Sequence, residues 1–332
     1  MSHRIKRREF ITLVASAVAT WPLAARAQQS TVPVIGYLTT FLGDATSRRF
    51  AEAFREGLKE QGFVEGQNVA VEYRSVEQGQ YDQLRKMAAD FVGRGIAVLF
   101  ATPIPAAVAA KAATATTPIV FVIGSDPVEM GLVASLSRPG ANATGATFFS
   151  VHLGAKRLEL LRELAPSAAS VALLVHPSNP TTARQIKDTQ AAAAALRLQF
   201  ATVSASSPGE FDTAFATLVE QRTNALMVSA DSLFTSHSDQ LVALAARHSI
   251  PTMYYAREFV AAGGLISYAA NFADSYRQAG SYVARILKGE KAADLPVLQP
   301  TKFQLVINLK TAKALDLAIP PIMQMTADEV IE

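Results

Sequence analysis

Short apolar runs alternate with helical patterns along most of this chain, and this alternation restricts the fold more than any other feature. The run Val32–Leu38, for example, precedes a segment over 46–61 whose apolar residues recur at three- and four-residue spacing. Strands separated by helices are typical of a parallel sheet that has helices on its faces. The alternation therefore predicts an α/β fold.

The same pattern runs through the chain twice. Pro118 and Pro251 open the fourth expected strand of each half. The expected strands cover 32–38, 68–75, 96–102, 118–124 and 143–149 in the first half, and 170–176, 198–204, 225–230, 251–256 and 263–270 in the second half. The two halves share order and length but hardly any sequence, so we interpret them as an architectural repeat.

The last sixty residues do not begin a third unit. They contain a helix over 272–290, a Pro-containing linker, a strand over 303–309, a short helix and a polar tail. One helix and one strand cannot form a domain, so we expect each to complete an earlier half. We therefore expect two doubly wound parallel-sheet lobes joined by three crossovers, with a cleft between them. Lobe 1 would comprise 31–149 plus about 271–297, and lobe 2 would comprise 150–270 plus about 298–325.

The first 27 residues have the pattern of an export signal. A basic start precedes the apolar stretch Ile11–Ala19, and Ala25–Ala27 forms an A-x-A cleavage site. Arg7 and Arg8, followed by apolar residues, resemble a twin-arginine signal. We expect cleavage after Ala27 and a periplasmic protein. An uncleaved membrane anchor is the alternative, although the apolar stretch is shorter than the about 20 residues that a span needs.

The formal net charge of +3 belongs to this leader. It holds five of the 31 Lys and Arg residues and one of the 28 Asp and Glu residues, which leaves 26 basic and 27 acidic residues in the body. A nearly neutral body offers no basic surface for a polyanion, so we expect no nucleic-acid partner.

Enzyme signatures are missing from the sequence. The chain has no cysteine, which excludes disulfides, thiol nucleophiles and cysteine-ligated metals. We find no dinucleotide-binding glycine motif, no phosphate-binding loop, no nucleophile elbow and no S-x-x-K motif. His152, His176, His237 and His248 lack the spacing of metal ligands, although His176 ends a strand where a ligand could contact it. We expect a protein that is not an enzyme and has no cofactor or metal.

In open parallel sheets, ligands bind beyond the carboxyl ends of the strands, so the residues that follow each strand are the candidate site. Several of them are Ser, Thr or Asn, which also cap helices. A helix N-terminus presents free N–H groups to a ligand carboxylate. Tyr268 is one of six aromatic residues at strands that could stack on a ligand, the alternative being a place in the core. The candidate ligand-binding residues are Thr39, Thr40, Thr102, Ser125, Asp126, Ser178, Asn179, Asp231, Glu258 and Tyr268.

Three of these candidates are acids. Asp126 lies eight residues beyond Pro118, and Glu258 lies seven beyond Pro251. We therefore expect these two carboxylates to face the cleft from opposite lobes, with Asp231 at the end of a third strand. Such a set suits an ammonium group; the alternative is that each acid merely forms a turn or caps a helix.

Several blocks of the sequence carry a family resemblance, among them "RREFITL", "FREGLKEQGFVEGQNVAVEYR", "KRLELLRELAP", "LVHPSNP" and "REFVAAGGLISY". The most specific blocks are "GSDPVEMGLVASLSRPGANATG" (124–145) and "PTKFQLVINLKTAKALDL" (300–317). Over essentially the whole chain, the sequence resembles substrate-binding proteins of ATP-binding-cassette (ABC) uptake systems related to tryptophan/tyrosine-type binding proteins. Asp316 stands where members of that family usually have glycine.

This resemblance implies a type I periplasmic-binding-protein fold with three crossovers. It also implies capture of a small solute, such as an aromatic or other amino acid, by lobe closure and its delivery to an ABC permease in the inner membrane. We expect the protein to be a monomer. In members that bind aromatic amino acids, an acid in the cleft holds the amine, and Ser and Thr side chains with helix N-terminal amides hold the carboxylate. Asp126 lies in the motif that carries the acid's role, and the corresponding loop positions are Thr102, Ser125, Ser178 and Asn179.

Two further functions fit the same fold. One is a ligand-sensing domain that serves a separate signalling partner. The other, less favoured, is an exported α/β enzyme with Asp126 or Glu258 as general acid or base, against which the lack of a nucleophile–base pair argues. A DNA-binding repressor is the least favoured, because an export signal and a nearly neutral body both oppose it.

Overall fold

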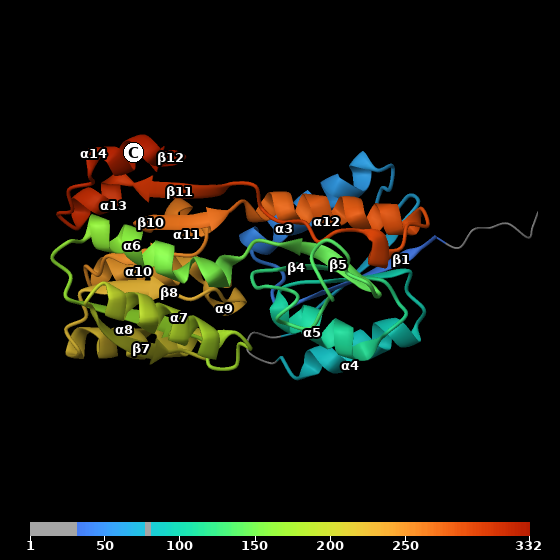
Figure 1. The fold of residues 1–332 in the computed structure, drawn as a ribbon, viewed down its shortest axis with the longest axis horizontal. Helices are drawn as coiled ribbons and strands as arrows, with labels where there is room; N and C mark the ends of the chain where they lie inside the picture. Colours follow the sequence, from blue (N-terminus) through green and yellow to red (C-terminus); the bar gives the residue numbers. More distant parts are fainter. Residues whose placement is uncertain (1–31, 77–80) are drawn as a thin grey trace, which may run out of the picture. The chain divides into compact units, whose positions relative to one another are not determined.

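The computed structural model of the protein describes residues 32–76 and 81–332. The expected signal segment, residues 1–27, lies outside the described residues. Residues 34–332 belong to one unit, which contains two β-sheets flanked by helices (Figure 1).

The first sheet has five parallel strands in the order β2-β1-β3-β4-β5. Each overlaps one of the five strands that the sequence predicts for the first half. Its strands are Val34–Thr39 (β1), Ala70–Ser75 (β2), Val98–Ala101 (β3), Ile119–Ile123 (β4) and Ala143–Thr147 (β5).

Helices cover both faces of this sheet. Successive side chains of each strand therefore alternate between two buried faces. In β4, Val120 and Val122 belong to one hydrophobic cluster, with helices Ala45–Glu60 (α3) and Phe272–Leu287 (α12). Phe121 belongs to the other cluster, with helices Gln83–Gly93 (α4) and Ile104–Ala113 (α5). The sequence order places α12 far from α3, yet the two helices lie side by side (Figure 1).

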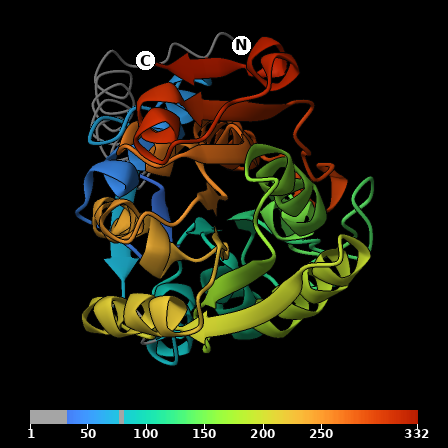
Figure 2. The ribbon, with the colours of Figure 1, turned by 90° about the vertical axis from the view of Figure 1, so that its left-hand side faces the viewer.

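The second sheet repeats this strand order and extends it. Its order is β12-β11-β10-β9-β8-β6-β7, so β7-β6-β8-β9-β10 matches β2-β1-β3-β4-β5 of the first sheet and confirms the predicted repeat. Figure 2 faces this lobe, with the red β12 and the yellow-green β7 at opposite edges of the sheet. The strands are Ser170–Val175 (β6), Gln199–Ser204 (β7), Ala225–Val228 (β8), Thr252–Tyr254 (β9), Ile266–Ala270 (β10), Phe303–Asn308 (β11) and Glu329–Ile331 (β12).

Helices again cover both faces of the second sheet. Helix Gly154–Leu164 (α6) packs with Val171 and Leu173 of β6, whereas helices Phe211–Glu220 (α8) and Ser238–Arg247 (α10) pack with the opposite face. The remaining helices are Thr182–Ala195 (α7), Ser232–Ser236 (α9), Arg257–Ala261 (α11), Leu309–Ala314 (α13) and Pro321–Thr326 (α14), with 3-10 turns at Ser150–Leu153 (η1), Pro208–Glu210 (η2) and Ala292–Asp294 (η3).

Two features of the C-terminal region differ from the expectation. The tail that was expected to be only polar contains α14 and β12, and β12 pairs in parallel with β11. A three-residue strand is too short to show an alternating pattern, so the sequence carries no signal for it. In addition, β11 runs antiparallel to β10, so the second sheet is not parallel throughout.

The chain passes three times between the two sheets. It leaves β5 and enters the second lobe at η1, returns after β10 to form α12 beside α3, and leaves again after Leu298, which bridges Ala146 of β5 before β11 begins. These passages support the expected lobe limits, which stay a prediction.

Helices α3 and α12 approach each other at two glycines. A Cβ atom placed on Gly57 of α3 would lie 1.8 Å from the carbonyl oxygen of Arg277, and one on Gly280 of α12 would lie 2.1 Å from the carbonyl oxygen of Phe54. No side chain fits between the helices at these points. The contact sets the position of Phe50, Phe272 and Tyr276, which these two helices carry to the cavity described next.

Candidate functional site

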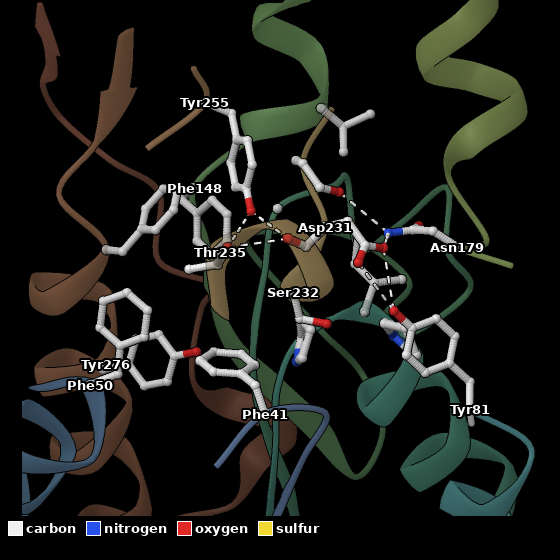
Figure 3. Close-up of a pocket in the computed structure, with 17 residues that line it drawn as sticks. Phe41, Phe50, Tyr81, Phe148, Asn179, Asp231, Ser232, Thr235, Tyr255 and Tyr276 are labelled. Carbon is white, nitrogen blue, oxygen red and sulfur yellow. Dashed lines mark hydrogen bonds between the residues drawn. The ribbon is translucent and has the colours of Figure 1, made fainter. Parts of the chain in front are cut away.

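A cavity of about 570 Å³, including solvent at its mouth, lies between segments of the two lobes. Aromatic side chains gather at one end of the cavity and polar side chains at the other (Figure 3).

The aromatic end comes mainly from the first lobe. Phe41 follows β1, Phe50 lies on α3, and Phe148 follows β5. Tyr276 of α12 stacks on Phe50 with ring centres 4.6 Å apart and 13° between the ring planes. Phe272 of α12 lies with its ring centre 4.2 Å from that of Phe148. These buried rings form a wall that suits a flat apolar group.

Asp231 is the centre of the polar end. It caps α9, where its Oδ1 accepts the Leu233 amide at 2.8 Å, and its side chain is only 1% exposed. Its Oδ2 accepts a hydrogen bond from Asn179 Nδ2 at 2.6 Å, and His176 Nδ1 lies 3.1 Å from the same oxygen. Within the described part of the chain, no Lys or Arg nitrogen lies within 4.0 Å of this carboxylate. A buried carboxylate therefore faces the cavity without a permanent cation.

Tyr81 reaches Asp231 from the first lobe. Its hydroxyl lies 3.3 Å from both carboxylate oxygens and 3.2 Å from His176 Nδ1. An O–H···O bond is normally about 2.5–3.0 Å long, so these two contacts to the carboxylate are weak. Burial raises the pKa of Tyr81, with the Asp231 carboxylate adding to the effect, so the hydroxyl keeps its proton.

Other hydroxyl groups of the cavity are paired within the protein. Thr40 Oγ1 donates to Ser232 Oγ at 2.7 Å, which joins the two lobes beside Asp231. The hydroxyls of Thr102 and Tyr276 lie 2.8 Å apart. Tyr255 donates to the carbonyl oxygen of Asp231, and burial raises its pKa as it does that of Tyr276.

Arg157 of α6 lies buried behind the cavity wall. Its guanidinium donates to the carbonyl oxygen of Ser150 at 2.6 Å, to that of Tyr268 at 2.8 Å and to that of Tyr255 at 3.4 Å, and to Ser150 Oγ at 3.1 Å. No carboxylate of the described residues pairs with it, and burial lowers the pKa of Arg157 to about 9. One of its acceptors, Tyr255, lines the cavity, and another, Ser150, directly precedes the lining residue Val151.

The structure brings some of the predicted residues to the cavity. Asn179 and Asp231 line it, and Thr40 and Thr102 hydrogen-bond to lining residues. Phe148 and Tyr255, two of the aromatic residues that follow strands, line it as well.

The remaining predicted residues lie outside the lining. Thr39 is buried and bonds to the Phe41 carbonyl oxygen, and the carbonyl oxygen of Ser125 accepts from Thr147. Ser178 is exposed, and Tyr268 packs its ring against Phe303.

The two acids expected to face each other across the cleft do not line the cavity. Asp126 accepts the Val128 amide at 2.8 Å in its own turn, which is the alternative role that the sequence allowed. Glu258 lies in the first turn of α11, 3.5 Å from Arg49.

Sequence reasoning missed five aromatic lining residues that lie in helices or in loops: Phe41, Phe50, Tyr81, Phe272 and Tyr276. We considered only residues that directly follow strands, so residues within the helices α3 and α12 were not among the candidates. The available signal was the run of aromatic residues at the start of the helix that follows the second crossover, Phe272 and Tyr276, which share one helix face.

Other classes of site find no support in the part of the chain that the structure describes. Residues 32–76 and 81–332 contain no group of three His, Cys, Asp or Glu residues that could hold a metal ion. Among the same residues, no helix is both long and apolar enough to cross a membrane.

Comparison with known proteins places the chain in a family. The family model described as ABC transporter substrate binding protein matches residues 37–331. A tyrosine-binding protein from Clostridioides difficile (strain R20291) is 26% identical over 280 residues, which are 84% of this chain and 78% of that protein.

Two solved structures extend the comparison. An ABC domain in complex with L-Trp from Streptococcus pneumonia is 26% identical, covers 91% of this chain and all of its own, and superposes with a TM-score of 0.80. A ligand-free, open substrate-binding protein with adhesive properties from Clostridium difficile is 25% identical, covers 90% of this chain and 99% of its own, and gives a TM-score of 0.63. The two-lobed α/β architecture is the type I periplasmic-binding-protein fold expected from the sequence. The chain belongs to the family of ABC transporter substrate-binding proteins.

Proposed function

We propose that this protein captures a small solute that carries an aromatic ring and an ammonium group, such as an aromatic amino acid, and delivers it to the permease of an ABC uptake system. The observation that carries the proposal is the pairing of a wall of aromatic rings with a buried carboxylate that has no Lys or Arg partner among the described residues. The ring of the solute would lie against Phe50, Phe148 and Tyr276.

Asp231 would bind the ammonium group of the solute. A buried carboxylate without a permanent cation as its partner costs free energy even when it accepts hydrogen bonds, and a ligand cation would lower this cost. The weak contacts of Tyr81 with both oxygens leave room for a stronger donor, since a shorter charge-assisted bond from the ligand can replace them.

Contacts across the cleft support binding by lobe closure. Thr40 and Tyr81 of the first lobe bond to Ser232 and Asp231 of the second. The structure superposes better on the solved L-Trp complex (TM-score 0.80) than on the solved open, ligand-free protein (TM-score 0.63), although the two are nearly equal in sequence identity to this chain. A solute held between the lobes would favour this closed arrangement over an open one.

The N-terminal segment supports export. Its basic start, apolar stretch and A-x-A site at Ala25–Ala27 would direct the chain to the periplasm, with cleavage after Ala27. A periplasmic monomer could present the solute directly to a permease in the inner membrane.

Calorimetric titration of the purified protein with L-Trp, L-Phe and L-Tyr tests the proposal. We expect saturable binding of at least one of them, and a loss of about 100-fold in affinity for Asp231→Asn, because truncating a buried charge pair costs about 3 kcal/mol. Asp212→Asn, at a 67% exposed surface acid of the second lobe, serves as the matched control and should bind as the unmodified protein does. Absence of binding for all three amino acids would refute the proposal, and full binding by Asp231→Asn would refute the role of Asp231.

Asp126→Asn distinguishes the site described here from the one that the sequence predicts. We expect this variant to bind normally, because the Asp126 carboxylate bonds within its own turn. A loss at Asp126 with none at Asp231 would support the sequence prediction instead.

A further inference from the structure

The chain makes an unusual bend where it first passes from one lobe to the other. Phe149 has φ 46° and ψ 27°, the left-handed conformation that bulky residues rarely adopt. Such a conformation costs of order 1–2 kcal/mol for a residue other than glycine and persists only where the surroundings enforce it. Its neighbours Phe148 and Val151 both line the cavity.

The first lobe holds the bend through backbone hydrogen bonds. The Phe148 amide donates to the carbonyl oxygen of Ile123 at 3.0 Å, and the Val151 amide donates to that of Gly124 at 2.9 Å. Gly124 makes this close fit possible, since a Cβ atom there would lie 2.8 Å from the Phe148 ring. Both bonds reach the end of β4.

The second lobe holds the same bend through Arg157. Two of its four hydrogen bonds go to Ser150, one to the carbonyl oxygen and one to Oγ. The other two go to the carbonyl oxygens of Tyr268 in β10 and of Tyr255 on the cavity wall. A buried cation without a carboxylate partner among the described residues is costly, so the cost must be offset by what these bonds hold in place.

We propose that Arg157 is a positioning residue for solute binding: it holds the left-handed bend at Phe149 and thereby fixes Phe148 and Val151, which both line the cavity, where they would contact the solute. The planar guanidinium suits this role because it addresses acceptors on three separate segments at once. Without it, Phe149 would relax to a negative φ, and solute binding would have to restore the bend.

A double-variant cycle tests this proposal. Arg157→Lys keeps the charge but not the fork of donors, and we expect its affinity for the probe L-Trp to fall about 10-fold, the equivalent of the backbone cost. Phe149→Gly should bind L-Trp within about threefold of the unmodified protein, because glycine adopts the left-handed region freely. The decisive expectation is that Phe149→Gly restores most of the affinity lost by Arg157→Lys. A purely structural role for Arg157 predicts no such rescue, and its absence would overturn the proposal.

A second measurement does not depend on the solute. The chain contains no cysteine, so Lys86→Cys on α4 and Lys187→Cys on α7, both exposed, allow spin labels to report the distance between the lobes. In the ligand-free protein we expect Arg157→Lys to broaden the distance distribution relative to the unmodified protein.

The affinity measurement and the distance measurement separate this inference from the proposed function. Only the affinity measurement rests on the proposed function, because it uses L-Trp as the probe. If L-Trp does not bind but the distances behave as described, the choice of solute fails and the positioning role stands. If Arg157→Lys folds only when Phe149 is also glycine, the proposal is supported. If both proteins fail to fold, or if the distances do not change, Arg157 has a general structural role and the proposal is wrong.

Discussion

The close approach of α3 and α12 yields a prediction whose size follows from the structure. Gly280→Ala would place a methyl group 2.1 Å from the carbonyl oxygen of Phe54, and contacts below 3.0 Å essentially never occur, so the helices must separate by roughly 1 Å. The neighbouring atom is backbone and cannot rotate away.

The expected change in stability combines two opposing effects. Overpacking in a rigid contact costs about 3 kcal/mol, and replacing glycine by alanine in a helix returns about 1 kcal/mol. We therefore expect Gly280→Ala to lower the free energy of unfolding by about 2 kcal/mol. Because α12 carries Phe272 and Tyr276 to the cavity, this variant should also weaken solute binding.

Gly93→Ala is the matched control. Gly93 ends α4, has no atom within 4 Å of the position that an added Cβ would occupy, and lies outside the α3–α12 contact. Urea unfolding of the two variants under one condition should therefore show Gly280→Ala less stable and Gly93→Ala unchanged or slightly more stable. If both variants unfold at the same urea concentration, the helices are not in the tight contact described here.

Two further predictions concern the C-terminal region. Asp316→Gly should raise the free energy of unfolding by about 0.5–1 kcal/mol, since Asp316 is exposed with φ 54°, where glycine is unstrained; a lower urea midpoint would contradict this. The Arg257 guanidinium donates to the Glu329 carboxylate and holds the pKa of that carboxyl below its usual value. The ion pair therefore stabilises the folded protein above the unfolded pKa of about 4.3, and this stabilisation is lost as the pH falls through the lower folded pKa. Glu329→Gln should accordingly be less stable than the unmodified protein at neutral pH and converge with it in acid, and an equal difference at both pH values would be evidence against the ion pair.

The sequence predicts the architecture well because the architecture depends on local patterns. Apolar runs such as that of β4 and the amphipathic helix α3 report their structure directly, and the repeat of strand order follows from reading both halves in the same way. The strand over 303–309 was predicted, but neither its antiparallel direction as β11 nor the short β12 was predictable, because neither strand direction nor a three-residue pairing leaves a periodic signal.

Of the residues at the candidate site, the sequence predicted only those that directly follow strands. Asp231 and Asn179 follow strands and line the cavity, whereas Asp126 follows one and turns its carboxylate to the Val128 amide. Nothing in the sequence distinguishes these two aspartates, since both precede turn or helix starts. Tyr276 and Phe50 reach the cavity because two helices distant in sequence pack together, and this contact is visible only in three dimensions.

The short strand β12 has a consequence for how the protein behaves in solution. The neighbouring β11 reads "FQLVIN", six consecutive residues rich in β-forming side chains, and it lies next to the edge of its sheet. Pairing of β12 with Val306–Asn308 covers the second half of that strand, whose three residues are all buried. An uncovered edge of this kind is a template for pairing with another molecule. Strand β12 thus protects the protein against self-association. A protein that lost this strand would be prone to aggregate, although the cavity lined by Asp231 and Tyr276 would be unchanged.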